Sequence, residues 1–151
     1  MAPFNAAPIL FESVSAVTAT NSVDLGTKRF VGDEEYIYVY NAGGSQISTG
    51  RVATVSAVTG YSVTVSSVSG AFIIGACKNA TLTTATYGWL VTKGWVDGAT
   101  NGMASTALAG GDPVQAAADG AICKGETGPY IGKIVAATAS AGTGTIYIST
   151  Y

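Results

Sequence analysis

Residues that could support catalysis or metal binding are few in this chain and widely spaced. The sequence contains no histidine, the side chain that most often acts as a general base and as a metal ligand. The one acidic run among its nine acidic residues is Asp33-Glu34-Glu35. A calcium loop supplies oxygen ligands from alternating positions. This run does not match that spacing, so we expect a solvated turn here.

The two cysteines, Cys77 and Cys123, are 46 positions apart by number (123 minus 77). Zinc needs four ligands in a close group, and two distant cysteines without histidine do not provide them. Both cysteines lie in apolar surroundings, because Cys77 follows the run 71–76 and Cys123 follows Ile122. Two interpretations stay open, a single disulfide and two buried free thiols.

Two glycine-containing segments resemble nucleotide-binding loops, but neither has all the residues that the motif requires. Residues 120–126 have the glycine spacing of a phosphate loop, but Glu126 occupies the position of the lysine that binds phosphate. Residues 142–147 begin like a dinucleotide fingerprint, yet they lack the third glycine and lead into a strand. We therefore expect no enzyme, no catalytic or metal-binding residues and no cofactor. An open pocket with two carboxylates of strongly perturbed pKa would reopen the question.

The rest of the sequence is typical of β structure. Residues 52–60 (VATVSAVTG) and 62–70 (SVTVSSVSG) form a near-repeat in which each copy ends in glycine. Because β-branched side chains favour pleated strands, we expect two adjacent hairpin strands. In residues 36–40, strict alternation places three tyrosines on one face and Ile37 with Val39 on the other.

Further short strands are expected throughout the second half of the chain. They are 87–98 with a glycine-centred bend, 111–116 and 120–125 joined by a turn at 119–120, and a terminal hairpin of 130–136 and 145–149. We expect Trp89 and Trp95 to anchor the core under the bend. Strands at intervals of roughly ten residues, without a long helical pattern, predict an all-β fold, either a small antiparallel β-barrel or a β-sandwich.

The amino-acid composition limits the classes of partner that the chain can be expected to bind. Only 11% of the residues are charged and the net charge is −2, whereas soluble domains average about 25% charged residues. Scattered cations argue against nucleic acid as a partner, and no segment reaches the length of a membrane span. A surface of small and hydroxylated side chains is cheap to desolvate, so it suits packing against other protein.

The first 23 residues differ from the rest and predict an extended N-terminal arm before a β domain at 24–151. Pro3 and Pro8 would interrupt a sheet ladder. The arm also carries large apolar side chains, which are the candidate anchors: Phe4, Ile9, Leu10 and Phe11. Two alternatives stay open, docking of the arm onto another protein and packing on its own domain.

Glycine-punctuated strand boundaries in residues 25–149 resemble those of the capsid decoration, or cement, proteins of tailed bacteriophages. The residues that carry the resemblance are 25–27, 36–40, 50–53, 87–91, 111–114, 118–120 and 131–133. The resemblance implies a small β-barrel or sandwich, usually a homotrimer, on the outer surface of the capsid of the virion. It also implies that the major capsid protein is the partner, that residues 1–23 clamp the capsid, and that no residue is catalytic.

An alternative function is a carbohydrate-binding or host-attachment β-domain of a phage fibre or secreted protein. Five aromatic residues motivate it: Tyr36, Tyr38, Tyr40, Trp89 and Trp95. Their rings could stack on sugars if they were exposed together. Burial of both tryptophans would remove this alternative.

Overall fold

The structure is a computed structural model of the chain. It describes residues 13–56, 60–65, 72–102, 106–126, 129–136, 139 and 141–150. Within these residues the chain forms strands joined by turns and one short 3-10 turn, with no α-helix. The elements in chain order are β1 (Val17–Thr18), β2 (Lys28–Val31), β3 (Glu34–Asn41), β4 (Val52–Val55), β5 (Ser62–Val65), β6 (Ile73–Ala76), β7 (Tyr87–Thr100), β8 (Pro113–Ala116), η1 (Ala118–Gly120), β9 (Ile122–Lys124), β10 (Gly132–Ala136) and β11 (Thr143–Ser149).

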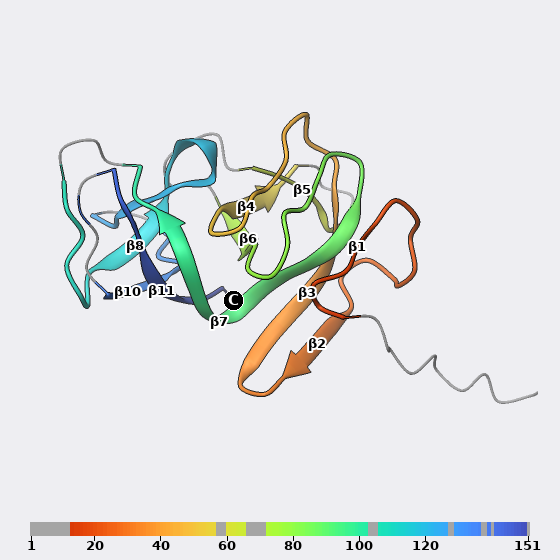
Figure 1. Cartoon of the computed structure of the whole chain (residues 1–151), viewed down its shortest axis with the longest axis horizontal. Helices are drawn as coiled ribbons and strands as arrows, with labels where there is room; N and C mark the ends of the chain where they lie inside the picture. Colours follow the sequence, from red (N-terminus) through yellow and green to blue (C-terminus); the bar gives the residue numbers. More distant parts are fainter. Residues whose placement is uncertain are drawn as a thin grey trace, which may run out of the picture.

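The first lobe is a closed five-stranded barrel. Its strands follow the order β3, β5, β4, β6 and β7, and β7 pairs back with β3 to close the ring. The β3–β5 pairing is parallel and the other four are antiparallel. The strand β2 extends the sheet on one side of β3, and β1 pairs with the start of β7. In Figure 1 this lobe lies on the right.

The long strand β7 belongs both to the barrel and to a second lobe, which consists of the second half of β7 with β11, β10, β8 and β9 and is called the second sheet below (Figure 1). Its first half pairs with β3 up to Lys93, and from Lys93 onward it pairs with β11. The partner changes at Gly94, whose φ of 143° is a backbone conformation that glycine adopts without strain. The second sheet continues through β10, β8 and β9, and a parallel bridge from Ile122 to Asn101 returns it to the end of β7.

Two large apolar clusters make up most of the core. One fills the barrel and includes Ile37 and Val39 from β3 with Leu90 from β7. The other lies between the barrel and the second sheet, and includes Tyr38, Trp89 and residues of β8 to β11. Both faces of β3 are therefore buried, and the expected alternation of tyrosines against Ile37 and Val39 is confirmed.

The all-β prediction and its hairpins are confirmed. The near-repeat forms β4 and β5, which pair as an antiparallel hairpin. β8 and β9 are joined through η1, and β10 pairs with β11 near the end of the chain. The prediction that both tryptophans lie in the core is wrong for Trp95, since Trp89 is 4% exposed and Trp95 is 50% exposed.

The segment expected to be an arm, residues 1–23, is described from residue 13 onward. Val17 and Thr18 pair with Gly88 and Tyr87 of the barrel, while Val14 and Val23 pack against the core. The four candidate anchors at positions 4, 9, 10 and 11 lie outside the described residues.

Both cysteines are buried free thiols, and burial raises the pKa of Cys77 to about 11. Within the described part of the chain, no helix has the length and hydropathy needed to cross a bilayer.

Candidate functional site: a pocket at the open end of the barrel

One end of the barrel is plugged by its own loops. Ile47 and Leu82 form a bridge across this end, and both side chains are buried with Cys77 in the barrel interior. Asn41, the last residue of β3, ties the two loops together, since its side-chain nitrogen lies 3.0 Å from the carbonyl oxygens of Ser45 and Leu82. Any site inside the barrel must therefore open at the other end.

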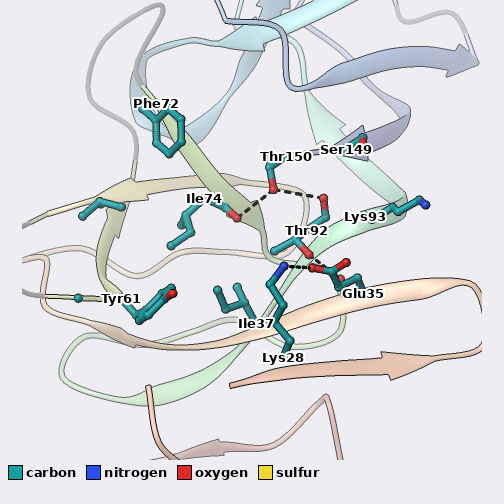
Figure 2. Close-up of a pocket in the computed structure, with 12 residues that line it drawn as sticks. Lys28, Glu35, Ile37, Tyr61, Phe72, Ile74, Thr92, Lys93, Ser149 and Thr150 are labelled. Carbon is teal, nitrogen blue, oxygen red and sulfur yellow. Dashed lines mark hydrogen bonds and ion pairs between the residues drawn. The ribbon is translucent and has the colours of Figure 1, made fainter. Parts of the chain in front are cut away.

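A pocket of about 790 Å³ occupies that other end, a volume within the usual range of ligand pockets. Its floor includes Ile37 of β3 and Ile74 of β6, which continue the apolar interior of the barrel. Figure 2 shows Phe72 and Tyr61 on one side of the pocket and the polar side chains on the other. The remaining lining residues are Lys28, Glu35, Val55, Gly60, Thr92, Lys93, Ser149 and Thr150.

The rim of the pocket exposes large apolar side chains. Phe72 is 63% exposed, Tyr61 39% and Val55 38%. Phe30 of the outer strand β2 is 70% exposed and pairs directly with Glu35 of the pocket lining, so their side chains share one face of the sheet. We call these four residues together with the pocket the docking face, of which Val55, Tyr61 and Phe72 line the pocket and Phe30 lies on the neighbouring strand. Exposed apolar groups gathered at a pocket are typical of a surface that binds a partner.

The polar side of the pocket is held together by short contacts. Lys28 Nζ lies 2.7 Å from Glu35 Oε1, and Thr92 Oγ1 donates a hydrogen bond to the Glu35 carbonyl oxygen. Thr150 Oγ1 donates to the carbonyl oxygens of Ile74 and Thr92, each at 3.2 Å (Figure 2). These contacts join β2, β3, β6, β7 and the end of the chain into one wall.

A second polar group lies where β7 bends. Lys78 pairs with Glu34, and the Tyr36 hydroxyl donates to Glu34 Oε2 at 2.5 Å. Asn79 Nδ2 donates to the same tyrosine oxygen at 3.2 Å. The expectation of a solvated turn for the acidic run therefore holds for exposed Asp33 but is wrong for Glu34 and Glu35, because each forms an ion pair within the sheet.

These contacts shift the pKa values of the groups involved. Burial acts to raise the pKa of Glu34, but the hydrogen bonds from Lys78 and Tyr36 outweigh it and the net pKa is lowered from 4.5. The hydrogen bond from Lys28 lowers the pKa of Glu35, again from 4.5. Burial and the hydrogen bond to Glu34 raise the pKa of Tyr36 to about 12.

We expect folding stability to be nearly constant from about pH 5.5 to 8. Carboxyl groups with a lowered folded pKa stabilise the fold above their unfolded pKa, and this stabilisation is lost as the pH falls through the folded pKa. Cys77 and Tyr36 have raised pKa values, so the contribution of the thiol is lost as the pH rises from about 9 to about 11, and that of the tyrosine as it rises from about 10 to about 12. The chain has no histidine to titrate between these limits. Thermal unfolding across pH 3–11 measures the profile, and Glu34→Gln should flatten its acid limb. A transition centred near pH 7 would contradict this expectation.

The pocket is chemically suited to binding. Its carboxylate is paired and has a lowered pKa, whereas a general acid at neutral pH needs a raised one. No group of three or more histidine, cysteine or acidic residues in the described structure is arranged to hold a metal ion. The site therefore offers apolar surface, hydroxyl groups and a compensated charge pair to a partner.

The aromatic platform expected for a sugar is not formed by the residues that motivated it. Tyr36, Tyr38 and Trp89 are buried, and Tyr40 packs against Tyr87 with ring centroids 4.7 Å apart. Trp95 alone of the five faces solvent to a large extent. Sequence reasoning also missed Phe30 and Phe72 as site residues, although a phenylalanine in a predicted turn or edge position is a usable signal.

No protein-family model matches the sequence, and no curated protein matches it. Among solved structures the fold is similar to the crystal structure of the N base of head fiber gp8.5 in bacteriophage phi29. The match has a TM-score of 0.54 and 12% sequence identity, and it covers 76% of this chain and 94% of that chain.

Proposed function

We propose that this chain is a structural virion protein that decorates a phage head by binding the outer surface of its capsid and stabilising contacts between coat subunits. The observation that carries the proposal is the shared fold, since the N base of a phage head fiber matches the chain over 76% of its length. The decoration role is the more specific part of the proposal, and it is supported by the docking face.

The docking face supports binding to protein. Three of its exposed apolar residues, Val55, Tyr61 and Phe72, line a pocket in which Lys28 and Glu35 form an ion pair. A partner that covers this apolar rim buries Lys28 and Glu35 as a pair, which keeps the cost of desolvation low, and Lys93 is the one further charged residue that it meets in the pocket lining. The composition agrees, because only 11% of the residues are charged.

In this proposal the protein stabilises the capsid through several contacts of low individual affinity that form at the same time. A subunit that touches two or more coat subunits binds the second at a high effective concentration once the first is bound. Separating the coat subunits then requires all the contacts to break together. In this proposal residues 1–23 supply an additional contact, and assembly as a homotrimer multiplies the number of contacts per particle.

The direct test mixes the purified chain with heads that lack it. We expect saturable, stoichiometric co-sedimentation at about micromolar concentration, and a rise in the temperature at which the heads disassemble. A fibre base would bind heads without raising that temperature. Absence of binding would contradict the head-binding proposal itself.

Deleting residues 1–12 is expected to weaken head binding at least about tenfold. The segment carries Phe4, Ile9, Leu10 and Phe11, and burying one such side chain contributes roughly 1.5–3 kcal/mol. Quantitative co-sedimentation measures the loss. A variant of full length with these four residues changed to serine controls for chain length and should lose the same affinity. Full affinity in both variants would remove the arm from the proposal.

A further inference from the structure

The outer face of the second sheet carries a pair of aromatic rings that the docking face does not include. Trp95 of β7 and Tyr147 of β11 are directly paired in the sheet. Their ring centroids lie 5.3 Å apart at an interplanar angle of 76°. Trp95 is 50% exposed, so about half of the residue's surface is accessible to solvent beside its T-shaped contact with Tyr147.

A groove of about 470 Å³ lies beside these rings. It is lined by Lys93, Tyr130, Gly132, Lys133, Tyr147 and Ser149. Tyr130 is 53% exposed, and its ring lies so close to Gly125 that a Cβ there would overlap it. The absence of a side chain at Gly125 thus makes room for the ring of Tyr130, which lines the groove.

The groove is cationic. Lys93 and Lys133 are exposed and no carboxylate is among its lining residues. Lys133 pairs with Tyr147 across β10 and β11. Two carboxylates lie nearby: Asp97 accepts a hydrogen bond from Thr145 at 2.7 Å, and Glu35, which pairs with Lys93 in the sheet, forms its ion pair with Lys28. A ligand in the groove therefore meets two ammonium groups and the tyrosine and serine hydroxyls, with the exposed indole of Trp95 next to the groove on the far side of Tyr147.

We propose that this groove binds an anionic saccharide. A sugar ring presents C–H groups on its faces, which stack on an exposed indole, and hydroxyl groups at its edge, which hydrogen-bond to Tyr147 and Ser149. A carboxylate on the sugar pairs with Lys93 or Lys133. Two isolated lysines are too few for nucleic acid, which needs clustered cations along its backbone. The groove shares Lys93 and Ser149 with the pocket of the docking face, whereas Tyr147 and Lys133 do not line that pocket. Titration of the isolated chain therefore tests the sugar site apart from attachment to heads.

Titration of the isolated full chain with tetragalacturonate, followed by tryptophan fluorescence, tests the proposal. Trp95 is exposed and Trp89 is buried, so a change on binding reports on Trp95. We expect a Kd of about 0.1–1 mM for tetragalacturonate and at least tenfold weaker binding of its methyl ester, which has the same rings without the charge. Sialyllactose against lactose is a second matched pair that covers a different acidic sugar.

Trp95→Ala, followed by calorimetry because the reporter is lost, should weaken binding at least tenfold. Lys133→Gln should reduce the preference for the acid over its ester. Phe72→Ala on the docking face is the control and should bind as the unmodified chain does. Absence of binding to both acidic sugars, equal binding of acid and ester, or full affinity in Trp95→Ala would each overturn the proposal. A Trp95→Ala variant that loses head binding instead would assign the groove to a protein partner.

Discussion

Replacing Phe30 and Phe72 together with aspartate is expected to reduce the affinity for phage heads by at least about a hundredfold. Central apolar residues of an interface typically contribute 2 kcal/mol or more each, and every 1.4 kcal/mol is a tenfold change in Kd. The aspartates add to this loss, because a docked partner would bury two new charges beside Glu35, and of the two lysines that line the pocket Lys28 is already paired with Glu35. Co-sedimentation with heads lacking the protein measures the affinity.

The double variant should fold normally. Phe30 is 70% exposed and Phe72 is 63% exposed, so their replacement removes little from the core, and thermal unfolding should change only slightly. Val135→Asp is the matched control, since Val135 is also an exposed apolar residue, at 44%, and does not line the pocket. Loss of head binding in this control, or its retention in the double variant, would place the contact elsewhere.

The strands of this fold could be predicted from sequence because their signals are local. The alternation of residues 36–40 predicts a strand, and Gly60 marks the end of the first half of the near-repeat. Both patterns can be recognised within a few consecutive residues. The closure of the barrel could not be predicted, because it depends on the parallel pairing of Tyr40 with Ser62 and on a single register contact between Ala76 and Val91. Nothing in either segment specifies a distant partner.

The position of Trp95 shows the same limit within one strand. By parity Trp95 shares the face of Trp89 and Val91. The first half of β7 is covered on both faces, whereas in the second half the residues at 93, 95 and 97 face solvent. What changes at Gly94 is the set of neighbouring strands, and this set depends on the path of the whole chain.

The docking face was also beyond sequence reasoning. Its four exposed apolar residues come from β2, the end of β4, the turn before β5 and the residue before β6. They meet because these segments surround the same end of the barrel. Exposure of Phe30 follows from the position of β2 at the end of the sheet order, which is a property of the topology.

Asn41→Ala is expected to cost about 3–5 kcal/mol of folding stability, the largest effect that we anticipate for a single polar side chain here. Asn41 is fully buried. Its nitrogen lies 3.0, 3.0 and 3.2 Å from the carbonyl oxygens of Ser45, Leu82 and Thr83, and its oxygen accepts from the Gly43 amide at 3.1 Å. Alanine removes all four of these contacts, which join the two loops at the plugged end of the barrel. The Leu82 carbonyl keeps the Ile47 amide and the Thr83 carbonyl keeps the Thr86 hydroxyl, so the cost comes from the four lost hydrogen bonds.

The Asn41→Asp variant distinguishes the loss of hydrogen bonds from the loss of side-chain volume. A carboxylate fills the same space but cannot donate to the carbonyl oxygens, so at pH 7 we expect a cost at least equal to that of alanine. Burial among carbonyl oxygens raises the folded pKa of such a carboxyl group, so the penalty relative to Asn41→Ala should shrink as the pH falls from 7 towards 4. Urea unfolding measures both variants.

Asn79→Ala, which removes one hydrogen bond from an exposed residue, is the control and should cost less than about 1 kcal/mol. A similarly small cost for Asn41→Ala would mean that water or neighbouring groups replace the lost contacts, and that the barrel end does not depend on this side chain.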